Sequence, residues 1–227
     1  MAANYLFDQQ KAKAELLGFF KTEKAKVNSF GSTVNQTFEA QIFARVIKKY
    51  RASGWAVSLI NPLIEGKRKF KLKFNTKGAP KGYSYAYCVN AQGQECQIRH
   101  GLRVRTKSHK QRNRFTANIV CDIVIMNNVT IDHYKTGTAL PNSELISFGE
   151  VKHMYAFAEL IASFLGLIFE IQPNRLKRIR NKTWTSGSHV PPFLYVSGKL
   201  YPTALGIQET ITQRKFDVDI YSFDNQM

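Results

Sequence analysis

The sequence predicts an α/β protein with a mixed sheet flanked by helices. Apolar residues recur at helical spacing in some segments and alternate at strand spacing in others, and the two kinds of segment follow one another along the chain. Of the 227 residues, 44% are hydrophobic and 22% are charged, as in an ordinary globular protein. We therefore expect a single domain, spanning residues 1–227, with a substantial core.

The N-terminal part predicts two helices and a strand. Apolar side chains at helical positions indicate a helix over residues 5–27, within an N-terminal helical segment of residues 1–30. A second helix is expected over residues 35–52, where apolar residues are three and four positions apart. Gly54 ends this helix, and residues 55–60 favour a short strand.

Residues 61–115 predict a basic β-hairpin insertion. Residues 69–74 alternate lysine with phenylalanine or leucine, which is typical of a half-buried strand. Residues 83–89 and 95–100 resemble the two arms of a hairpin, and residues 102–107 extend the same sheet.

We place the core of the domain at about residues 35–60 and 116–221. Its expected elements are strands over residues 117–126, 145–151, 193–197 and 216–221, and helices over residues 154–169 and 203–214. The apolar helix 154–169 is short for a membrane span and contains Glu159, so we expect it to be a buried helix.

Positive charge is concentrated in two segments. The formal net charge is +17. Residues 61–115 carry 14 basic side chains and two acids, residues 116–174 carry two basic side chains and six acids, and residues 175–182 carry five basic side chains. Two basic segments on either side of an acidic segment favour a polyanionic partner, and nucleic acid is the commonest such partner. A solvated basic surface would show the same composition. The expected contacts are Lys67, Arg68, Lys69, Lys71, Lys73, Arg103, Arg105, Lys107, Arg112, Arg114, Arg175 and Arg178.

Several other classes of protein lack support in the sequence. Three cysteines cannot form a disulfide framework, and the first residues lack the pattern of a signal peptide, so we expect a cytoplasmic protein that does not bind membranes. The sequence contains neither a phosphate-binding G-x-x-x-x-G-K-[ST] loop nor a G-x-S-x-G nucleophile motif.

Three ionisable residues stand out as a candidate active site. Asp122 interrupts an apolar strand, where an unpartnered carboxylate would be costly. Glu150 and Lys152 are two residues apart on the next strand, so their side chains share a face. If the two strands pair, the three groups converge, and two carboxylates together with the carbonyl of Val151 could hold Mg²⁺. Such an ion activates water and stabilises charge on a phosphate.

These residues resemble the motif of the PD-(D/E)XK nuclease superfamily, which has the restriction-endonuclease-like fold. The resembling segments are Ile119-Val-Cys-Asp122-Ile-Val-Ile and Ile146-Ser-Phe-Gly-Glu150-Val-Lys152. The resemblance implies an endonuclease that uses Mg²⁺ or Mn²⁺, with Asp122 and Glu150 as metal ligands and Lys152 as a catalytic residue. It also assigns a catalytic role to Glu39, an acid on the preceding helix.

The chain departs from the family pattern at two points. Cys121 stands where proline is often found, and the long separation between Asp122 and Glu150 leaves Asp132 or Glu144 as alternative metal ligands. By analogy with the family, we expect DNA rather than RNA as substrate, and a role in defence as a homodimer or as a subunit of a defence complex. The alternative is a nuclease-like subunit that binds nucleic acid, or takes part in assembly, without cutting.

Other candidate sites have simpler interpretations. Cys88, Cys96 and His100 do not match a zinc motif, so packing of the two cysteines across a hairpin is expected instead. His153 could contact a phosphate or cap a helix. The tyrosines at residues 83, 85 and 87 could stack on bases, but packing on the sheet is the simpler expectation.

Overall fold

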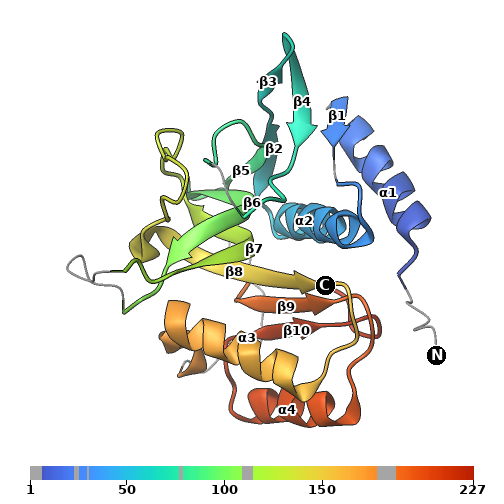
Figure 1. Ribbon diagram of the computed structural model, residues 1–227, viewed down its shortest axis with the longest axis vertical. Coiled ribbons are helices and arrows are strands. Elements are labelled where there is room, and N and C mark those ends of the chain that lie inside the picture. Colours follow the sequence, from blue (N-terminus) through green and yellow to red (C-terminus); the bar gives the residue numbers. More distant parts are fainter. Residues whose placement is uncertain (1–6, 23–25, 30, 77–78, 109–114, 178–187) are drawn as a thin grey trace.

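A seven-stranded mixed sheet forms the centre of the computed structural model, with helices on both faces (Figure 1). The structure describes residues 7–22, 26–29, 31–76, 79–108, 115–177 and 188–227. The helices are α1 (Gln9–Thr22), α2 (Val34–Ala52), α3 (Ala158–Ile171) and α4 (Pro202–Gln213), with short 3₁₀ turns at Asn142–Glu144 and Pro173–Leu176. The strands are β1 (Lys26–Ser29), β2 (Ala56–Ile60), β3 (Leu63–Ile64), β4 (Lys67–Lys71), β5 (Tyr85–Val89), β6 (Glu95–Arg105), β7 (Asn118–Asn127), β8 (Leu145–Lys152), β9 (Phe193–Val196) and β10 (Asp219–Tyr221). The predicted α/β class is confirmed.

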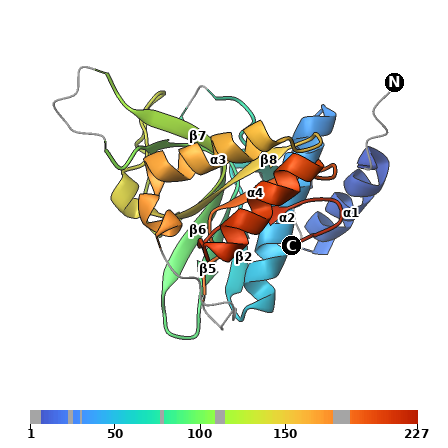
Figure 2. The same ribbon diagram turned by 90° about the horizontal axis from the view of Figure 1, so that it is seen from below.

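The central sheet has an antiparallel half and a parallel half. Its strand order is β10-β9-β8-β7-β6-β5-β2. Strands β2, β5, β6, β7 and β8 pair antiparallel, whereas β8, β9 and β10 pair parallel. Parallel neighbours need a crossover, and α3 and α4 provide the two crossovers. These two helices lie together on one face of the sheet, and α2 lies on the other (Figure 2).

Each face of the sheet is covered by its own hydrophobic cluster. On one side, Phe43 and Tyr50 of α2 pack with sheet residues such as Ile98. On the other side, Phe164 of α3 packs against Phe148 of β8, with ring centroids 6.0 Å apart. Because β8 is covered on both faces, charged side chains near its end are drawn into a partly desolvated environment.

Capping interactions fix the starts of the first two helices. Asp8 Oδ1 accepts hydrogen bonds from the backbone N–H groups of Gln10 and Lys11 at the start of α1. Thr33 and Gln36 form a reciprocal capping box at the start of α2. Helix α2 therefore begins within one residue of its predicted start.

The first helix is shorter than predicted. Helix α1 ends at Thr22, and residues 26–29 pair parallel with β4 as strand β1. The prediction of a helix to residue 27 was wrong there, because β1 gains its backbone hydrogen bonds from a strand more than 35 residues away in the sequence.

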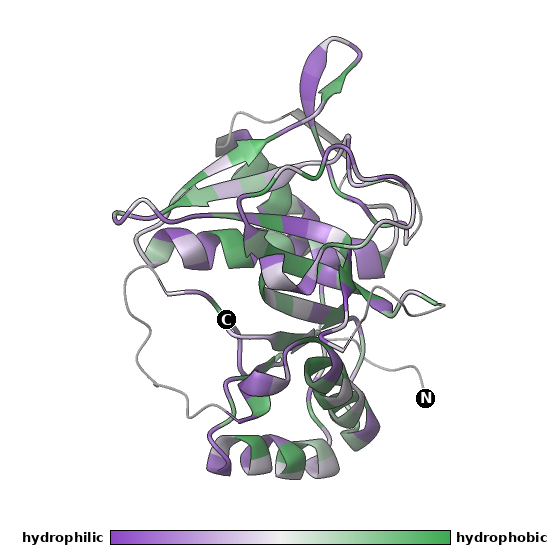
Figure 3. Ribbon diagram, turned by 90° about the vertical axis from the view of Figure 1, so that its left-hand side faces the viewer, coloured by the Kyte–Doolittle hydropathy of each residue, from purple (hydrophilic) through white to green (hydrophobic). Residues whose placement is uncertain are grey.

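The predicted insertion, residues 61–115, is mostly part of the core. Strand β6 is largely buried and pairs with β7 from Cys96–Asn127 to Arg105–Asn118, so β5 and β6 belong to the central sheet. Only β3 and β4 leave that sheet, forming a three-stranded sheet with β1. Their hairpin turns at Glu65 and Gly66, both with positive φ, and it projects from the body (Figure 3).

Two elements of the C-terminal half begin later than predicted. Helix α3 starts at Ala158, so residues 153–157 form a turn after β8 instead of the first turn of the helix. Strand β10 starts at Asp219, although residues 216–218 continue its alternating pattern. In each case the local pattern of apolar residues predicts the type of element correctly, but it does not predict the residue at which the helix or strand begins.

Gly149 is required where β8 meets β9. A Cβ at this position would lie 2.2 Å from Cζ of Phe193, a fully buried ring. We expect Gly149→Ala to lower the free energy of unfolding by about 1–3 kcal/mol, the usual cost of overpacking a core. Urea denaturation measures this change.

The control is Gly206→Ala in α4, where a Cβ would meet open space; it should stabilise the helix by up to about 1 kcal/mol. Equal effects of the two substitutions would contradict this interpretation.

Candidate active site

The candidate site lies where strands β7 and β8 separate. Their paired residues run from Met126–Leu145 to Ile123–Gly149. Asp122 is the next residue on β7, and its carboxylate Oδ2 accepts a hydrogen bond of 2.8 Å from the backbone N–H of Val151. The carboxylate of Asp122 therefore takes the place of the next backbone acceptor on β7, and beyond this point β7 and β8 no longer pair with each other.

Lys152 links the two carboxylates. Its Nζ lies 2.9 Å from Oδ2 of Asp122 and 2.9 Å from Oε2 of Glu150. The side chains of Lys152 and Asp122 are 38% and 21% exposed, whereas that of Glu150 is 8% exposed. The three groups thus gather as the strand pattern predicts, with a solvent-accessible side formed by Lys152 and Asp122.

The electrostatics of the cluster favour a protonated lysine beside a carboxyl group that is hard to ionise. Burial, followed by the neighbouring Asp122 carboxylate, raises the pKa of Glu150 to about 7, although Lys152 opposes both effects. Burial would lower the pKa of Lys152, but the carboxylates of Glu150 and Asp122 outweigh it and hold that pKa above its usual value. Lys152 is therefore a cation that can contact a phosphate.

The donor set suits a hard divalent cation. Oε1 of Glu150 is buried and accepts no hydrogen bond from any described residue, so it keeps a free coordination position. The two carboxylates would supply some of the oxygen ligands that Mg²⁺ prefers, and water and phosphate oxygens would supply the others. Across the described ranges, no cluster of three or more His, Cys, Asp or Glu side chains is arranged to hold a metal. Val151 contributes its N–H to Asp122, and a ligand role for its carbonyl stays a prediction.

Glu39 has a different partner from the one expected. Its Oε2 lies 3.0 Å from Nε2 of His100 on β6, and Nδ1 of the same ring lies 2.8 Å from the carbonyl oxygen of Lys73. Glu39 makes no hydrogen bond or ion pair with Asp122, Glu150 or Lys152 among the described residues, and its catalytic role stays a prediction.

The alternative ligands are used elsewhere. Glu144 Oε2 accepts a hydrogen bond of 3.1 Å from Asn127, and Asp132 is exposed in the segment after β7. Cys88 and Cys96 are buried, directly paired residues of β5 and β6, which confirms cross-strand packing. The hydroxyl of Ser197 lies 2.8 Å from Nδ1 of His153, so this histidine fixes the turn after β8.

The predicted nucleic-acid contacts divide into exposed and internally bound residues. Lys67, Arg68 and Lys107 are exposed, and Arg68 also donates a hydrogen bond of 3.0 Å to the carbonyl oxygen of Asn61. Lys73 is a correction: it is only 5% exposed, and its Nζ donates to the carbonyl oxygens of Asn75 and Gly101.

The remaining predicted contacts have identified neighbours or lie outside the described residues. Arg175 pairs with Asp217 and donates to the carbonyl of Ile146, so it fastens the turn after α3. The partly buried contacts, each with its neighbour, are Lys69 near Glu65, Lys71 over the Tyr83 ring, Arg103 bonded to Asn118, and Arg105 near Tyr134. Arg112, Arg114 and Arg178 lie outside the described residues.

The tyrosines beside the basic strands serve the fold. The Tyr85 ring lies 3.9 Å from the guanidinium carbon of Arg99, and Tyr87 donates a hydrogen bond to Glu95. Arg99 is nearly buried, and burial lowers its pKa to about 10. Packing on the sheet, the simpler expectation, therefore agrees with these contacts.

Comparisons with known proteins add no family assignment. No protein-family model, curated protein or solved structure matches this chain. In the part of the chain that the structure describes, every helix is too short or too polar to cross a bilayer.

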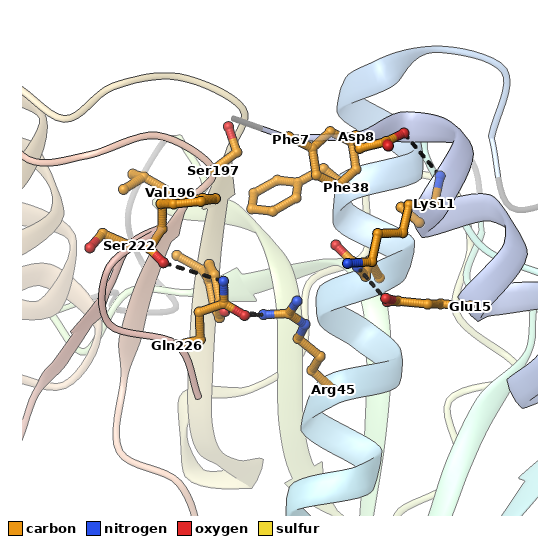
Figure 4. A pocket seen from close by; sticks show the side chains of 14 residues that line it. Phe7, Asp8, Lys11, Glu15, Phe38, Arg45, Val196, Ser197, Ser222 and Gln226 are labelled. Carbon is orange, nitrogen blue, oxygen red and sulfur yellow. Dashed lines mark hydrogen bonds between the residues drawn. The ribbon is translucent and has the colours of Figure 1, made fainter. Parts of the chain in front are cut away.

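A cavity beside the candidate site was not apparent from the sequence. It has a volume of about 480 Å³ and lies between α1, α2, the end of β9 and the C-terminal segment (Figure 4). The basic side chains that line the cavity are matched by acidic side chains of the same lining. Arg45, one of these basic side chains, donates hydrogen bonds to Tyr195 and to Gln226, the latter at 2.8 Å. No motif marks this cavity, because its lining comes from four distant segments.

The raised pKa of Glu150 predicts a specific dependence of stability on pH in the absence of divalent metal. A carboxyl group whose pKa rises on folding stabilises the protein fully below its unfolded value, and this contribution is lost as the pH rises through about 7. Relative to Glu150→Gln, the wild type should therefore lose stability between about pH 4.5 and 7, with a slope of at most about 1.4 kcal/mol per pH unit. Urea denaturation at several pH values measures the difference.

The matched control for this titration is Glu144→Gln. Glu144 is a partly exposed glutamate bonded to Asn127 and lies outside the cluster. Its substitution should leave the pH dependence of the wild type unchanged. A pH-independent difference between wild type and Glu150→Gln would show that Glu150 titrates normally.

Proposed function

We propose that this protein is a metal-dependent endonuclease that hydrolyses phosphodiester bonds of nucleic acid, with DNA as the preferred substrate. The observation that carries this proposal is the meeting of Asp122, Glu150 and Lys152 where β7 and β8 stop pairing with each other, with Lys152 at hydrogen-bond distance from both carboxylates. The net charge of +17 supports a polyanionic substrate. The restriction-endonuclease-like fold, suggested by the motif, belongs to the same proposal.

The side chains divide the work of hydrolysis between them. Asp122 and Glu150 provide the oxygen ligands for Mg²⁺ or Mn²⁺, which when bound would activate water and offset charge on the phosphate. Lys152 holds a phosphate oxygen or orients the attacking water through its ammonium group. The water loses a proton to solvent as its oxygen forms a bond to phosphorus, the bond from phosphorus to the leaving ester oxygen breaks, and the leaving oxygen takes up a proton from solvent.

A second candidate is a nucleic-acid-binding subunit without catalytic activity. The observation favouring it is that Lys152 already bonds both carboxylates, as in a purely structural ion-pair network. In that case the three residues would contribute to stability alone, and divalent metal would have no effect on bound nucleic acid.

Substitution of the cluster distinguishes the two candidates. We expect Asp122→Asn, Glu150→Gln and Lys152→Met each to lower the rate of cleavage with Mg²⁺ by at least about a hundredfold, because each removes a ligand or a charge from the reacting phosphate. Binding without metal should stay within about threefold of wild type. The assay follows supercoiled, linear and single-stranded DNA and RNA, with and without Mg²⁺ or Mn²⁺.

Two acids outside the cluster serve as controls for this assay. Asp132→Asn and Glu144→Gln remove carboxylates from the segments between β7 and β8, so both variants should cleave like the wild type. Wild-type cleavage by all three cluster variants would refute the proposal, and the absence of cleavage on every substrate would favour the binding subunit.

The projecting hairpin predicts a salt-dependent contribution to binding. Lys67 and Arg68 are exposed beside its turn, where each can neutralise one phosphate. The double variant Lys67→Gln/Arg68→Gln should therefore lower the slope of log K against log salt by roughly two. Lys73→Met is the internal control and should leave the slope unchanged, because its ammonium group points at carbonyl oxygens. Equal slopes for wild type and the double variant would exclude the hairpin from the interface.

A further inference from the structure

Two exposed aromatic rings lie at the start of helices α3 and α4. The rings of Phe157 and Tyr201 are stacked, with centroids 4.9 Å apart and an interplanar angle of 15°. They are nevertheless 45% and 44% exposed. Tyr155 adjoins the pair, with its ring centroid 5.8 Å from that of Tyr201. We call Phe157 and Tyr201 the aromatic pair.

Backbone hydrogen bonds hold the two turns that carry the aromatic pair. Ala156 N–H donates to the carbonyl of Lys199 at 3.0 Å, and Tyr201 N–H donates to the carbonyl of Ala156 at 3.0 Å. Ser197 N–H donates to the carbonyl of Lys152 at 3.1 Å. The rings therefore stand on a fixed frame, and binding to them would require little ordering of the backbone.

The same frame connects the aromatic pair to the candidate site. Phe157 follows Lys152 by five residues, and the turn between them begins at the end of β8. Both helices start on the side of the sheet where β8 and β9 end (Figure 1). Lys199, in the second turn, is 53% exposed, and its ammonium group lies 3.5 Å from the carboxylate of Asp224.

We propose that the aromatic pair stacks on an unpaired nucleobase next to the phosphate held at Asp122, Glu150 and Lys152, so that the substrate is single-stranded or locally unpaired nucleic acid. Every nucleobase offers a flat apolar face, and stacking on an aromatic side chain contributes binding energy without reading sequence. In a duplex these faces are covered by neighbouring bases. The inference rests on the proposed function for the phosphate, but the stacking itself does not require cleavage.

Binding without divalent metal tests the stacking directly. The probes are a labelled single-stranded DNA oligonucleotide and a blunt duplex of the same sequence, measured by fluorescence anisotropy in EDTA. We expect Phe157→Ala and Tyr201→Ala each to weaken single-strand binding by about tenfold. Phe157→Tyr and Tyr201→Phe should stay within about threefold of the wild type, because they keep the ring. Duplex affinity should change by less than about twofold in all four variants.

The matched control is Phe169→Ala. Phe169 is 63% exposed near the C-terminal end of α3, away from β8's end, so its loss should not change binding of either probe. Circular dichroism and thermal melting establish that each variant is folded. If an alanine variant unfolds, Phe157→Leu or Tyr201→Leu replaces it, because leucine keeps apolar volume without the aromatic ring, and the same loss of single-strand binding is expected.

Several results would overturn the inference. One is wild-type affinity of folded Phe157→Ala and Tyr201→Ala for the single strand, and another is an equal loss of single-strand and duplex affinity. A third is sedimentation showing self-association that Phe157→Ala abolishes while oligonucleotide affinity is unchanged, which would make the pair a protein contact. The proposed function fails separately: if no metal supports cleavage but the single-strand effect is present, the stacking stands and the nuclease assignment falls.

Discussion

The carboxylate of Asp122 is the interaction on which the candidate site depends. It accepts the N–H of Val151 and contacts the ammonium of Lys152, and so it joins β7 to β8 at the point where their backbone pairing stops. Without this acceptor, the N–H of Val151 would lose its hydrogen-bond partner, and Lys152 would keep Glu150 alone as a carboxylate partner within the cluster. The Asp122 side chain thus lies where the backbone pairing of β7 and β8 stops, and it also holds the ammonium group of Lys152 at the site.

The burial of Glu150 adds a second constraint. A carboxylate with so little exposure is tolerated because a lysine two residues away lies within 2.9 Å of it. Cys121, buried beside Asp122, adds no charge, since burial and the nearby carboxylates raise the pKa of its thiol well above its usual value. The site therefore has few polar groups, and the charge of each group depends on its neighbours. In such a network, a change in one charge has a large effect on the remaining groups.

The sequence predicts the site better than it predicts the surrounding surface. Asp122, Glu150 and Lys152 could be placed because strand alternation and a two-residue spacing are local patterns that survive folding. Glu39 and Lys73 could not, because their partners depend on how α2 and the segment after β4 pack against β6.

The same distinction holds for the fold. Most helices and strands follow from periodicity, whereas β1 depends on a partner supplied by tertiary structure. The residues predicted as one basic insertion divide between the central sheet and a hairpin, because the sequence marks strands but not their neighbours. Charge composition likewise locates basic segments without showing which side chains reach the surface.

Strand β1 also protects the molecule from a hazard. It pairs with residues 69–71 on one edge of β4, while β3 pairs with residues 67–68 on the other, so each edge has a partner along part of its length. A protein shortened to begin at Thr33 would expose unpaired backbone groups of β4, where lysine and arginine charges oppose association with another copy. The N-terminal segment therefore helps to keep separate molecules from joining strand to strand.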